Sequence, residues 1–214
     1  MASSRYAAAG MESEFQPGSR GRVLRNLLGI TGEREMEAGE TQLLSVAQRA
    51  ALKMYGSTHR FTPTDIRRLH RMWLGSIYPW AGNYRTVNIG KGGFQFAHAP
   101  LIPRLMVELG RGALRRHTPC GSSADVSAAR SLAEVHAELI LVHPFRDGNG
   151  RLARLLSLLM GSQAGLRSMD FSSLAGKGKR TYVQAIQAAM SHDYVPLETL
   201  FARVIGRRRA SSNS

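Results

Sequence analysis

The fold is decided by residues 143–154, which read HPFRDGNGRLAR. The chain before this stretch, residues 124–142, has helical periodicity, and residues 152–160 after it are apolar almost all round. An apolar helix of that kind is typical of the interior of a domain. The sequence therefore predicts two helices joined by a short turn. That turn and the start of the second helix carry an imidazole, a carboxylate, an amide, two glycines and three guanidinium groups.

This turn has the composition of an anion-binding site. Gly148 and Gly150 allow the backbone to approach a ligand closely. The helix that follows points its unpaired amides and the positive end of its dipole back at the turn, which is a common way to bind phosphate. Arg151 and Arg154 lie three residues apart on one helix face, so both guanidinium groups can contact the same polyanion.

The acidic residue in the turn predicts a metal ion beside the phosphates. Asp147 alone would repel a phosphate, but Mg²⁺ is typically bound by one or two carboxylates together with phosphate oxygens. His143 adds a side chain that can act as a base near neutral pH. The alternative is that His143 and Pro144 only end a helix, residues 148–150 form a plain turn and the arginines are surface charges. That alternative leaves the clustering of these groups unexplained.

At these residues the chain resembles the Fic family, whose motif H-x-F-x-[D/E]-G-N-G-R-x-x-R is matched at every position. The resemblance implies a small bacterial toxin-like protein that transfers AMP from ATP to a hydroxyl side chain of a target protein. It implies that His143 is the general base, that Phe145 anchors the turn in the core and that Asp147 binds Mg²⁺. It assigns ATP binding in the motif to Gly148, Asn149, Gly150, Arg151 and Arg154. The related death-on-curing kinases carry Lys in place of Gly150, which favours nucleotidyl transfer here.

Residues 87–97 are the second informative stretch, because apolar residues alternate on both sides of a glycine-rich tip. This pattern predicts a two-stranded hairpin, and a surface loop pinned by its aromatic residues is the alternative. In the Fic family such a hairpin is a flap on which the target pairs as an added strand. The resemblance assigns target docking to Ile89, Gly90, Gly92, Gly93 and Phe94. It also places Lys91 near the nucleotide.

The remaining helical patterns lie at residues 40–55, 62–73, 103–115, 179–190 and 196–205. Thr62, Pro63 and Asp65 form a helix-start signal. His59 and His70 are interpreted as surface or boundary residues, and His136 as a packed or boundary residue. Tyr182 and Gln184 match family positions that lie against the nucleotide, although Tyr182 is equally well explained as a core aromatic residue.

We therefore expect an all-α fold, a Fic-like helical bundle with a small β-hairpin flap beside the active site. Residues 1–22 are expected to form a flexible lead-in, residues 23–206 the Fic domain, and residues 207–214 a basic and polar tail. The 214 residues suffice for one domain with a proper core.

The composition limits the cellular locations and the classes of binding partner that we expect. A single cysteine, Cys120, excludes a disulfide framework and fits a reducing compartment. No stretch resembles a signal peptide or approaches the roughly 20 apolar residues of a membrane span, so we expect a cytoplasmic protein without a membrane partner. The net charge of +14 indicates nucleic acid, an acidic partner or only solubility. Basic residues are not interleaved with aromatic residues in a stripe, so we expect no nucleic-acid partner.

The same resemblance also bears on regulation and on the target. Many Fic proteins carry an inhibitory helix with the pattern [S/T]-x-x-x-E-[G/N], and no glutamate in this chain precedes Gly or Asn. The resemblance therefore implies an unrestrained enzyme or a separate antitoxin whose glutamate binds Arg154. It also makes the ATPase subunit of a type II topoisomerase a candidate target. The alternatives are a phosphotransferase, a transferase of another nucleotide and a non-enzymatic nucleic-acid-binding protein.

Overall fold

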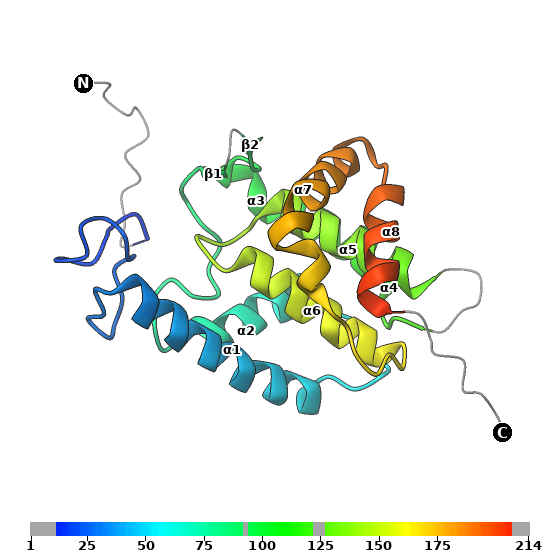
Figure 1. The fold of residues 1–214 in the computed structure, drawn as a ribbon, viewed down its shortest axis with the longest axis horizontal. Coiled ribbons are helices and arrows are strands. Elements are labelled where there is room, and N and C mark those ends of the chain that lie inside the picture. The colour runs from blue at the N-terminus through cyan, green and yellow to red at the C-terminus, as the bar shows by residue number, and fades with distance from the viewer. Residues whose placement is uncertain (1–11, 92–93, 122–126, 207–214) are drawn as a thin grey trace.

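The computed structural model describes residues 12–91, 94–121 and 127–206. Two helices, α5 (Ala128–Val142) and α6 (Asn149–Gln163), are joined by the motif turn and pack against each other. Figure 1 shows α6 crossing the middle of the molecule, with α1 (Glu33–Met54) and α2 (Pro63–Leu74) on one side. On the other side, α8 (Val195–Ile205) packs against α5.

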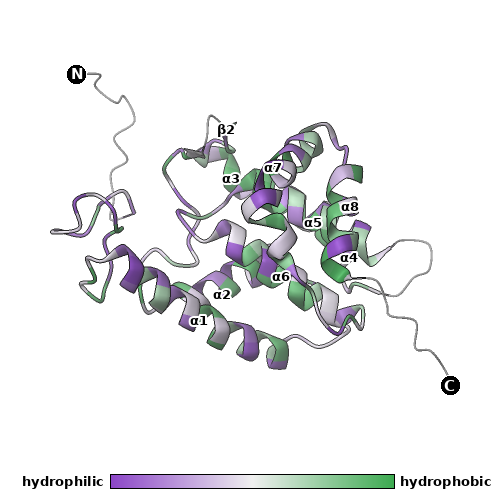
Figure 2. Cartoon of the chain, in the orientation of Figure 1, coloured by the Kyte–Doolittle hydropathy of each residue, from purple (hydrophilic) through white to green (hydrophobic). Residues whose placement is uncertain are grey.

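The burial of α6 confirms that the helix after the motif belongs to the core. Leu152, Leu155, Leu156, Leu159 and Met160 are each at most 2% exposed. Burying a leucine side chain contributes roughly 2 kcal/mol to the free energy of unfolding. Figure 2 shows apolar residues on α5 and α6 and a mixture of polar and apolar residues along α1. The motif turn is therefore attached to a helix in the core of the domain.

Helix α2 begins as the sequence predicts. The Thr62 side chain accepts a hydrogen bond from the Asp65 backbone N–H, and the Asp65 carboxylate accepts one from the Thr62 N–H at 2.9 Å. Pro63 occupies the first turn, where its missing N–H has no consequence.

Helix α1 starts seven residues earlier than the sequence pattern indicates, at Glu33 instead of Glu40. Gly39 lies inside the helix, where glycine costs about 1 kcal/mol relative to alanine. Met36 and Glu40, on either side of it, are both buried, so tertiary contacts override that local preference.

The chain between residues 99 and 117 is helical but irregular. It consists of η1 (Ala99–Leu101), α3 (Ile102–Leu109), the π-helical segment η2 (Gly110–Leu114) and α4 (Arg115–His117). The predicted single helix at residues 103–115 is interrupted because Gly112 leaves the helical conformation, with φ −93° and ψ −105°. The C-terminal half adds η3 (Phe171–Leu174), η4 (Gly176–Gly178), α7 (Lys179–Ala188) and η5 (Ala189–Ser191).

The predicted hairpin is present as two short antiparallel strands, β1 (Gly90–Lys91) and β2 (Phe94–Gln95). Gly90 pairs with Gln95 and Lys91 pairs with Phe94. Gly92 and Gly93, at the tip, lie outside the described residues. The all-α fold with a small hairpin is confirmed.

The predicted lead-in is described from residue 12 onward, and the predicted tail at residues 207–214 lies outside the described part. The Glu12 carboxylate accepts a hydrogen bond from the Thr86 N–H at 2.8 Å, and the Glu12 carbonyl accepts one from Arg146 Nε at 2.8 Å. The domain boundary at residue 23 stays a prediction. Within the described ranges, no helix is long and apolar enough to cross a membrane.

Candidate active site

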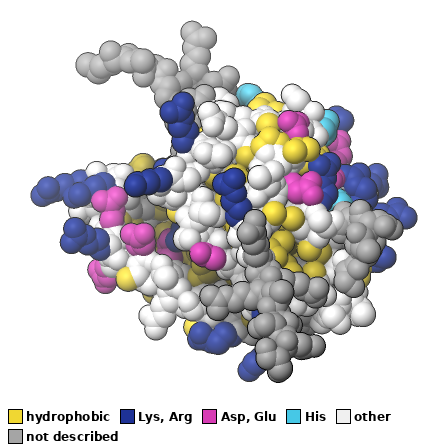
Figure 3. Space-filling view, turned by 45° about the vertical axis from the view of Figure 1, so that its right-hand side comes forward, with side chains coloured by type: hydrophobic (Ala, Val, Ile, Leu, Met, Phe, Trp, Pro, Cys, Tyr) yellow, Lys and Arg dark blue, Asp and Glu magenta, His cyan; other side chains and the backbone are white. Residues whose placement is uncertain are grey.

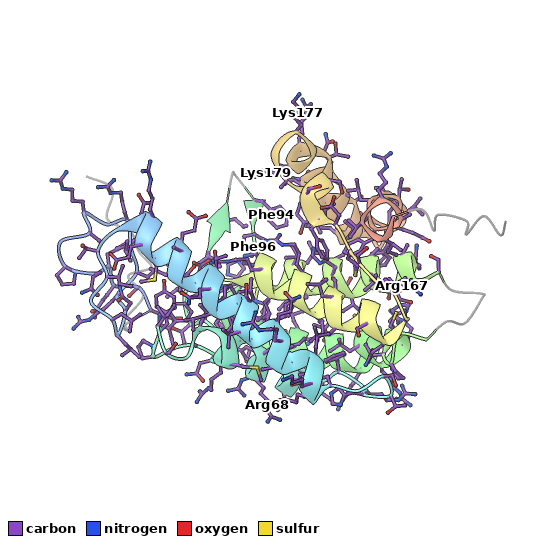
Figure 4. All side chains as sticks on the ribbon, turned by 60° about the horizontal axis from the view of Figure 1, so that its bottom comes forward. Arg68, Phe94, Phe96, Arg167, Lys177 and Lys179 are labelled. Atoms are coloured by element: carbon purple, nitrogen blue, oxygen red, sulfur yellow. The ribbon has the colours of Figure 1, made fainter. Side chains whose placement is uncertain are left out.

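A cavity of about 500 Å³ lies between the motif turn, the hairpin and the segment formed by η4 and α7. Figure 4 shows Phe94 and Phe96 near the hairpin, and Lys177 and Lys179 on the neighbouring segment, on the same side of the molecule. Of the residues singled out in the sequence, those that line the cavity are Phe94, His143, Asp147, Gly148, Asn149, Gly150, Arg151, Arg154 and Tyr182.

Among the described residues, Gln184, Ile89 and Gly90 do not line this cavity. Gln184 borders an adjacent, more open hollow of about 550 Å³, together with Lys179 and Arg180. Ile89 and Gly90 are part of the hairpin arm, where the Ile89 carbonyl accepts a hydrogen bond from the Phe96 N–H at 3.2 Å. Lys91 lies in β1, and its contact with the nucleotide stays a prediction.

The motif turn is closed by its own side chains. Asn149 is 2% exposed, and its carboxamide accepts a hydrogen bond from the Phe145 N–H at 2.9 Å and donates one to the Phe145 carbonyl at 2.7 Å. The Phe145 ring is fully buried and stacks on the His70 ring, with centroids 3.9 Å apart. The Asn149 side chain is therefore engaged in the turn, and its backbone N–H lies at the start of α6, where the amides are unpaired within the helix.

The two glycines of the turn serve different purposes. Gly148 has φ +81°, and a Cβ atom there would lie 2.8 Å from the Trp73 ring. The fold itself therefore requires glycine at this position. At Gly150 an added Cβ would meet nothing nearer than an Arg154 nitrogen at 3.8 Å. Gly150 lines the cavity, so the absence of its side chain leaves space for a ligand.

His70 packs against the motif turn from inside the protein. Its interpretation as a surface or boundary residue is wrong. It is 0% exposed, its Nδ1 accepts a hydrogen bond from the Gly82 N–H at 2.8 Å, and its Nε2 lies 3.1 Å from the Asp147 carbonyl. Since a carbonyl only accepts, Nε2 carries the proton. Burial lowers the pKa of His70 to about 4, so the ring is neutral at pH 7.

His143 ends α5 in a left-handed conformation with φ +49°, which turns the chain toward the cavity. Its Nδ1 lies 3.0 Å from the Ile140 carbonyl, and the ring stacks on Phe96 with centroids 3.6 Å apart. The neutral ring therefore carries its proton on Nδ1, which leaves Nε2 as the basic nitrogen. In this tautomer a general base accepts a proton at Nε2.

Arg85 is a residue that the sequence analysis missed. It is 2% exposed and donates hydrogen bonds to the carbonyls of His143 (2.8 Å), Val87 (2.5 Å) and Ala97 (2.5 Å). Val87 and Ala97 flank the hairpin, so one guanidinium ties both arms of the hairpin to the end of α5. No local pattern could reveal this role, because Ala97 and His143 lie 12 and 58 residues from Arg85 in the sequence.

Two arginines and a tyrosine of the cavity wall are partly buried or have polar partners. Arg154 is half-buried, and burial lowers the pKa of its guanidinium, which stays charged at pH 7. The Tyr182 hydroxyl oxygen lies 2.8 Å from His136 Nε2, and burial raises the pKa of Tyr182 to about 12. His136 is 1% exposed, which confirms that it is packed. Arg151 donates from Nη1 to the buried carboxylate of Glu40, at 2.6 Å.

The fit of a divalent cation depends on Asp147. Its side chain is half exposed, its Oδ1 accepts a hydrogen bond from the Gly148 N–H at 2.6 Å, and its Oδ2 lies 3.7 Å from Arg151 Nη2. Among the described residues, no group of three or more His, Cys, Asp and Glu side chains could hold a metal ion alone. One open carboxylate suits Mg²⁺ that takes its other ligands from phosphate oxygens and water.

Basic residues on one face of the described part of the molecule do not form a continuous surface. On the face shown in Figure 3, Lys and Arg side chains are scattered among polar and apolar groups. A continuous basic stripe, such as a nucleic-acid backbone needs, is not visible on this face.

The sequence and the fold were compared with those of known proteins. The sequence model of the Fic/DOC family matches residues 60–160. The probable protein adenylyltransferase y4lH of Sinorhizobium fredii is 30% identical over 187 residues, which cover 86% of this chain and 91% of that protein. The probable protein adenylyltransferase Fic of Escherichia coli is 27% identical, with 86% and 88% covered.

Among solved structures, the N-terminal Fic domain of a Bartonella effector protein from Bartonella sp. AR 15-3 matches with a TM-score of 0.73 and 20% identity. The match covers 94% of this chain and 95% of that one, and it shows the same fold. The family match and the y4lH relative establish the family: the chain belongs to the Fic/DOC family.

Proposed function

We propose that this chain is a protein adenylyltransferase, which transfers AMP from ATP to a hydroxyl side chain of a target protein. The observation that carries the proposal is the single cavity that His143, Asp147, Arg151 and Arg154 share with the N-terminus of α6. The names of the S. fredii and E. coli relatives, both probable protein adenylyltransferases, support it.

In this proposal His143 is the general base. The target hydroxyl oxygen attacks the α-phosphorus of ATP, its proton passes to His143 Nε2, and the bond from the α-phosphorus to the pyrophosphate oxygen breaks. General-base catalysis of this kind contributes about a hundred- to ten-thousandfold. The hydrogen bond from Nδ1 to the Ile140 carbonyl holds the ring in the required tautomer.

The departing pyrophosphate carries the charge that the rest of the site must stabilise. Arg151, Arg154 and the first backbone N–H groups of α6 supply positive charge and hydrogen-bond donors on one side of the cavity. Asp147 would hold Mg²⁺, which neutralises phosphate charge when bound. Tyr182 lines the same cavity and is the proposed contact for the rest of the nucleotide, ahead of Gln184 in the adjacent hollow.

The hairpin is the proposed docking site for the target. Its two short strands pair only with each other among the described residues, so a backbone edge remains for an added strand. The stacking of Phe96 on His143 links this edge to the base that activates the hydroxyl. The ATPase subunit of a type II topoisomerase is the candidate target that the family resemblance suggests.

Regulation by a separate antitoxin is part of the proposal. In the described part of the chain, Arg154 forms no ion pair with a carboxylate. An external glutamate that paired with Arg154 would displace the γ-phosphate and stop the reaction. We place the reaction in the cytoplasm, where ATP and such a partner are available.

The labelling pattern of a target tests this function. Purified protein is incubated with Mg²⁺, a cell lysate and ATP labelled at either the α- or the γ-phosphate. We expect label on protein only from α-labelled ATP. Label on protein from γ-labelled ATP would identify a phosphotransferase. If no protein is labelled and the purified chain retains nucleic acid from the lysate, the non-enzymatic alternative is favoured.

A further inference from the structure

Arg151 is held by a carboxylate that the catalytic motif does not contain. Glu40 lies on α1, 111 residues away in the sequence, and its Oε2 accepts a hydrogen bond from Arg151 Nη1 at 2.6 Å. Glu40 is 5% exposed. A buried carboxylate this close to a guanidinium forms a strong, charge-assisted hydrogen bond.

Glu40 is itself fixed by two further contacts. Its Oε1 accepts a hydrogen bond from the Tyr78 hydroxyl at 2.8 Å, and its backbone carbonyl accepts one from Trp73 Nε1 at 2.8 Å. The Trp73 ring also lies beneath the Arg151 guanidinium, whose carbon is 4.7 Å from the ring centroid. Glu40 therefore holds one edge of the guanidinium and Trp73 holds one face. The other N–H groups of Arg151 can point into the cavity that this residue lines.

A second carboxylate competes for the same arginine. Asp147 Oδ2 lies 3.7 Å from Arg151 Nη2, four residues earlier on the chain. The Asp147 side chain is 49% exposed, whereas that of Glu40 is 6% exposed. Solvent screens the contact with Asp147 more than the contact with Glu40, so Arg151 stays with Glu40. Without Glu40, Asp147 is the one carboxylate partner that the described residues offer to the Arg151 guanidinium.

We propose that Glu40 is a positioning residue of the active site, which aims Arg151 at the nucleotide phosphates and keeps it from pairing with Asp147. This inference rests on the proposed function, because it assigns the free carboxylate of Asp147 to a divalent cation bound with ATP. Glu40 touches no reacting atom in this assignment. It acts through Arg151.

A second buried, paired glutamate in the chain offers a matched control. Glu134 on α5 is 6% exposed and is paired with Arg116 and with His117, whose Nε2 lies 3.0 Å away. None of these three residues lines the cavity. Glu134→Gln therefore neutralises a buried, paired glutamate without altering the proposed site, and Glu40→Gln makes the same chemical change next to Arg151.

The test measures ATP binding by calorimetry at several Mg²⁺ concentrations and in EDTA, so that it does not depend on AMP transfer. For Glu40→Gln we expect ATP affinity to be about tenfold lower at saturating Mg²⁺. The Mg²⁺ concentration that gives half of the maximal ATP affinity should be severalfold higher. In EDTA, the ATP affinity should differ from that of the wild type by less than threefold. In an Asp147→Asn background, Glu40→Gln should have a much smaller effect, because the competing pair can no longer form. Glu134→Gln should match the wild type.

An unchanged Mg²⁺ dependence in Glu40→Gln, or an equal change in Glu134→Gln, would overturn the positioning role. If Glu40→Gln does not fold, Tyr78→Phe replaces it, since it releases one Glu40 oxygen and should shift the Mg²⁺ requirement in the same direction by a smaller factor. An unchanged requirement in that variant counts against the role as well. If the wild-type chain binds ATP but transfers no AMP, the proposed function is refuted and the positioning role of Glu40 is not. If the wild-type chain binds no ATP, both are refuted.

Discussion

The His143 imidazole stacks on the ring of Phe96, with their centroids 3.6 Å apart and their planes 16° from parallel. The first residue ends the helix that leads into the motif, and the second follows strand β2 of the hairpin. This contact joins the proposed base to the proposed docking edge, so the position of a target hydroxyl and the position of the base depend on the same pair of rings.

Replacing Phe96 with leucine should separate binding from transfer. The smaller, non-planar side chain cannot support the imidazole, so we expect the rate of AMP transfer to fall about tenfold or more. ATP affinity should change less than twofold, because Phe96 supplies no charge or hydrogen bond to the phosphates. Steady-state kinetics together with ATP calorimetry check this, and a loss confined to ATP affinity would contradict it.

The two glycines of the motif should respond oppositely to alanine. Gly148→Ala meets the Trp73 ring at 2.8 Å and requires a positive φ, so we expect a loss of at least 1–3 kcal/mol, as an order of magnitude, in the free energy of unfolding. Gly150→Ala has space for its methyl group and should leave this free energy unchanged or higher by about 0.4–1 kcal/mol.

The same Gly150→Ala chain should bind ATP at least tenfold more weakly, because its methyl group enters the cavity at the start of α6. Chemical denaturation and ATP calorimetry on both variants measure these effects. Equal stability losses in the two variants would show that Gly150 is needed by the fold and not by a ligand.

Stability should decrease as the pH falls from 6.5 to about 4. The unfolded chain protonates His70 near pH 6.5, whereas burial lowers the folded-state pKa to about 4, so the unfolded state binds more protons within this interval. The total loss is on the order of 3 kcal/mol. His136, whose pKa burial lowers to about 3, acts in the same direction.

His70→Gln removes one of these titrations, so its free energy of unfolding should vary less steeply between pH 6.5 and 4.5 than that of the wild type. Urea titrations at several pH values give both slopes. Identical slopes would mean that His70 is protonated equally in the folded and unfolded states.

Arg85→Lys tests the link between the hairpin and α5. A lysine ammonium cannot reach the three carbonyls of His143, Val87 and Ala97 in the fork geometry of a guanidinium. We expect faster hydrogen exchange at residues 87–91 and 94–97 and at least tenfold slower AMP transfer, with the α-helical content retained. Exchange rates equal to those of the wild type would exclude this link.

The features that the sequence predicts correctly are those encoded locally. The apolar pattern around Leu155 predicts a buried helix, Thr62 and Asp65 predict a helix start, and the alternation before and after the glycine-rich tip predicts a hairpin. The motif residues converge on one cavity because they occupy a single turn and the first two turns of one helix. Short-range geometry is sufficient for these predictions.

The contacts that support the site could not be predicted, because they join distant segments. Glu40 is 111 residues from Arg151, and His70 is 77 residues from Asp147. A glutamate in a helix and a histidine near an apolar face are ordinary surface residues unless the packing of α1 and α2 on α6 is known. Gln184 matches a family position that lies against the nucleotide, but in this structure it borders the neighbouring hollow and does not line the cavity.

The most direct measurement of the central claim compares wild-type protein with His143→Ala, using intact-protein mass spectrometry of a target after incubation with ATP and Mg²⁺. ATP calorimetry on both chains serves as the control for folding and binding. The account predicts that wild-type protein adds one AMP group to the target, and that His143→Ala binds ATP equally well but adds none. An AMP-modified target at an undiminished rate with His143→Ala would contradict it.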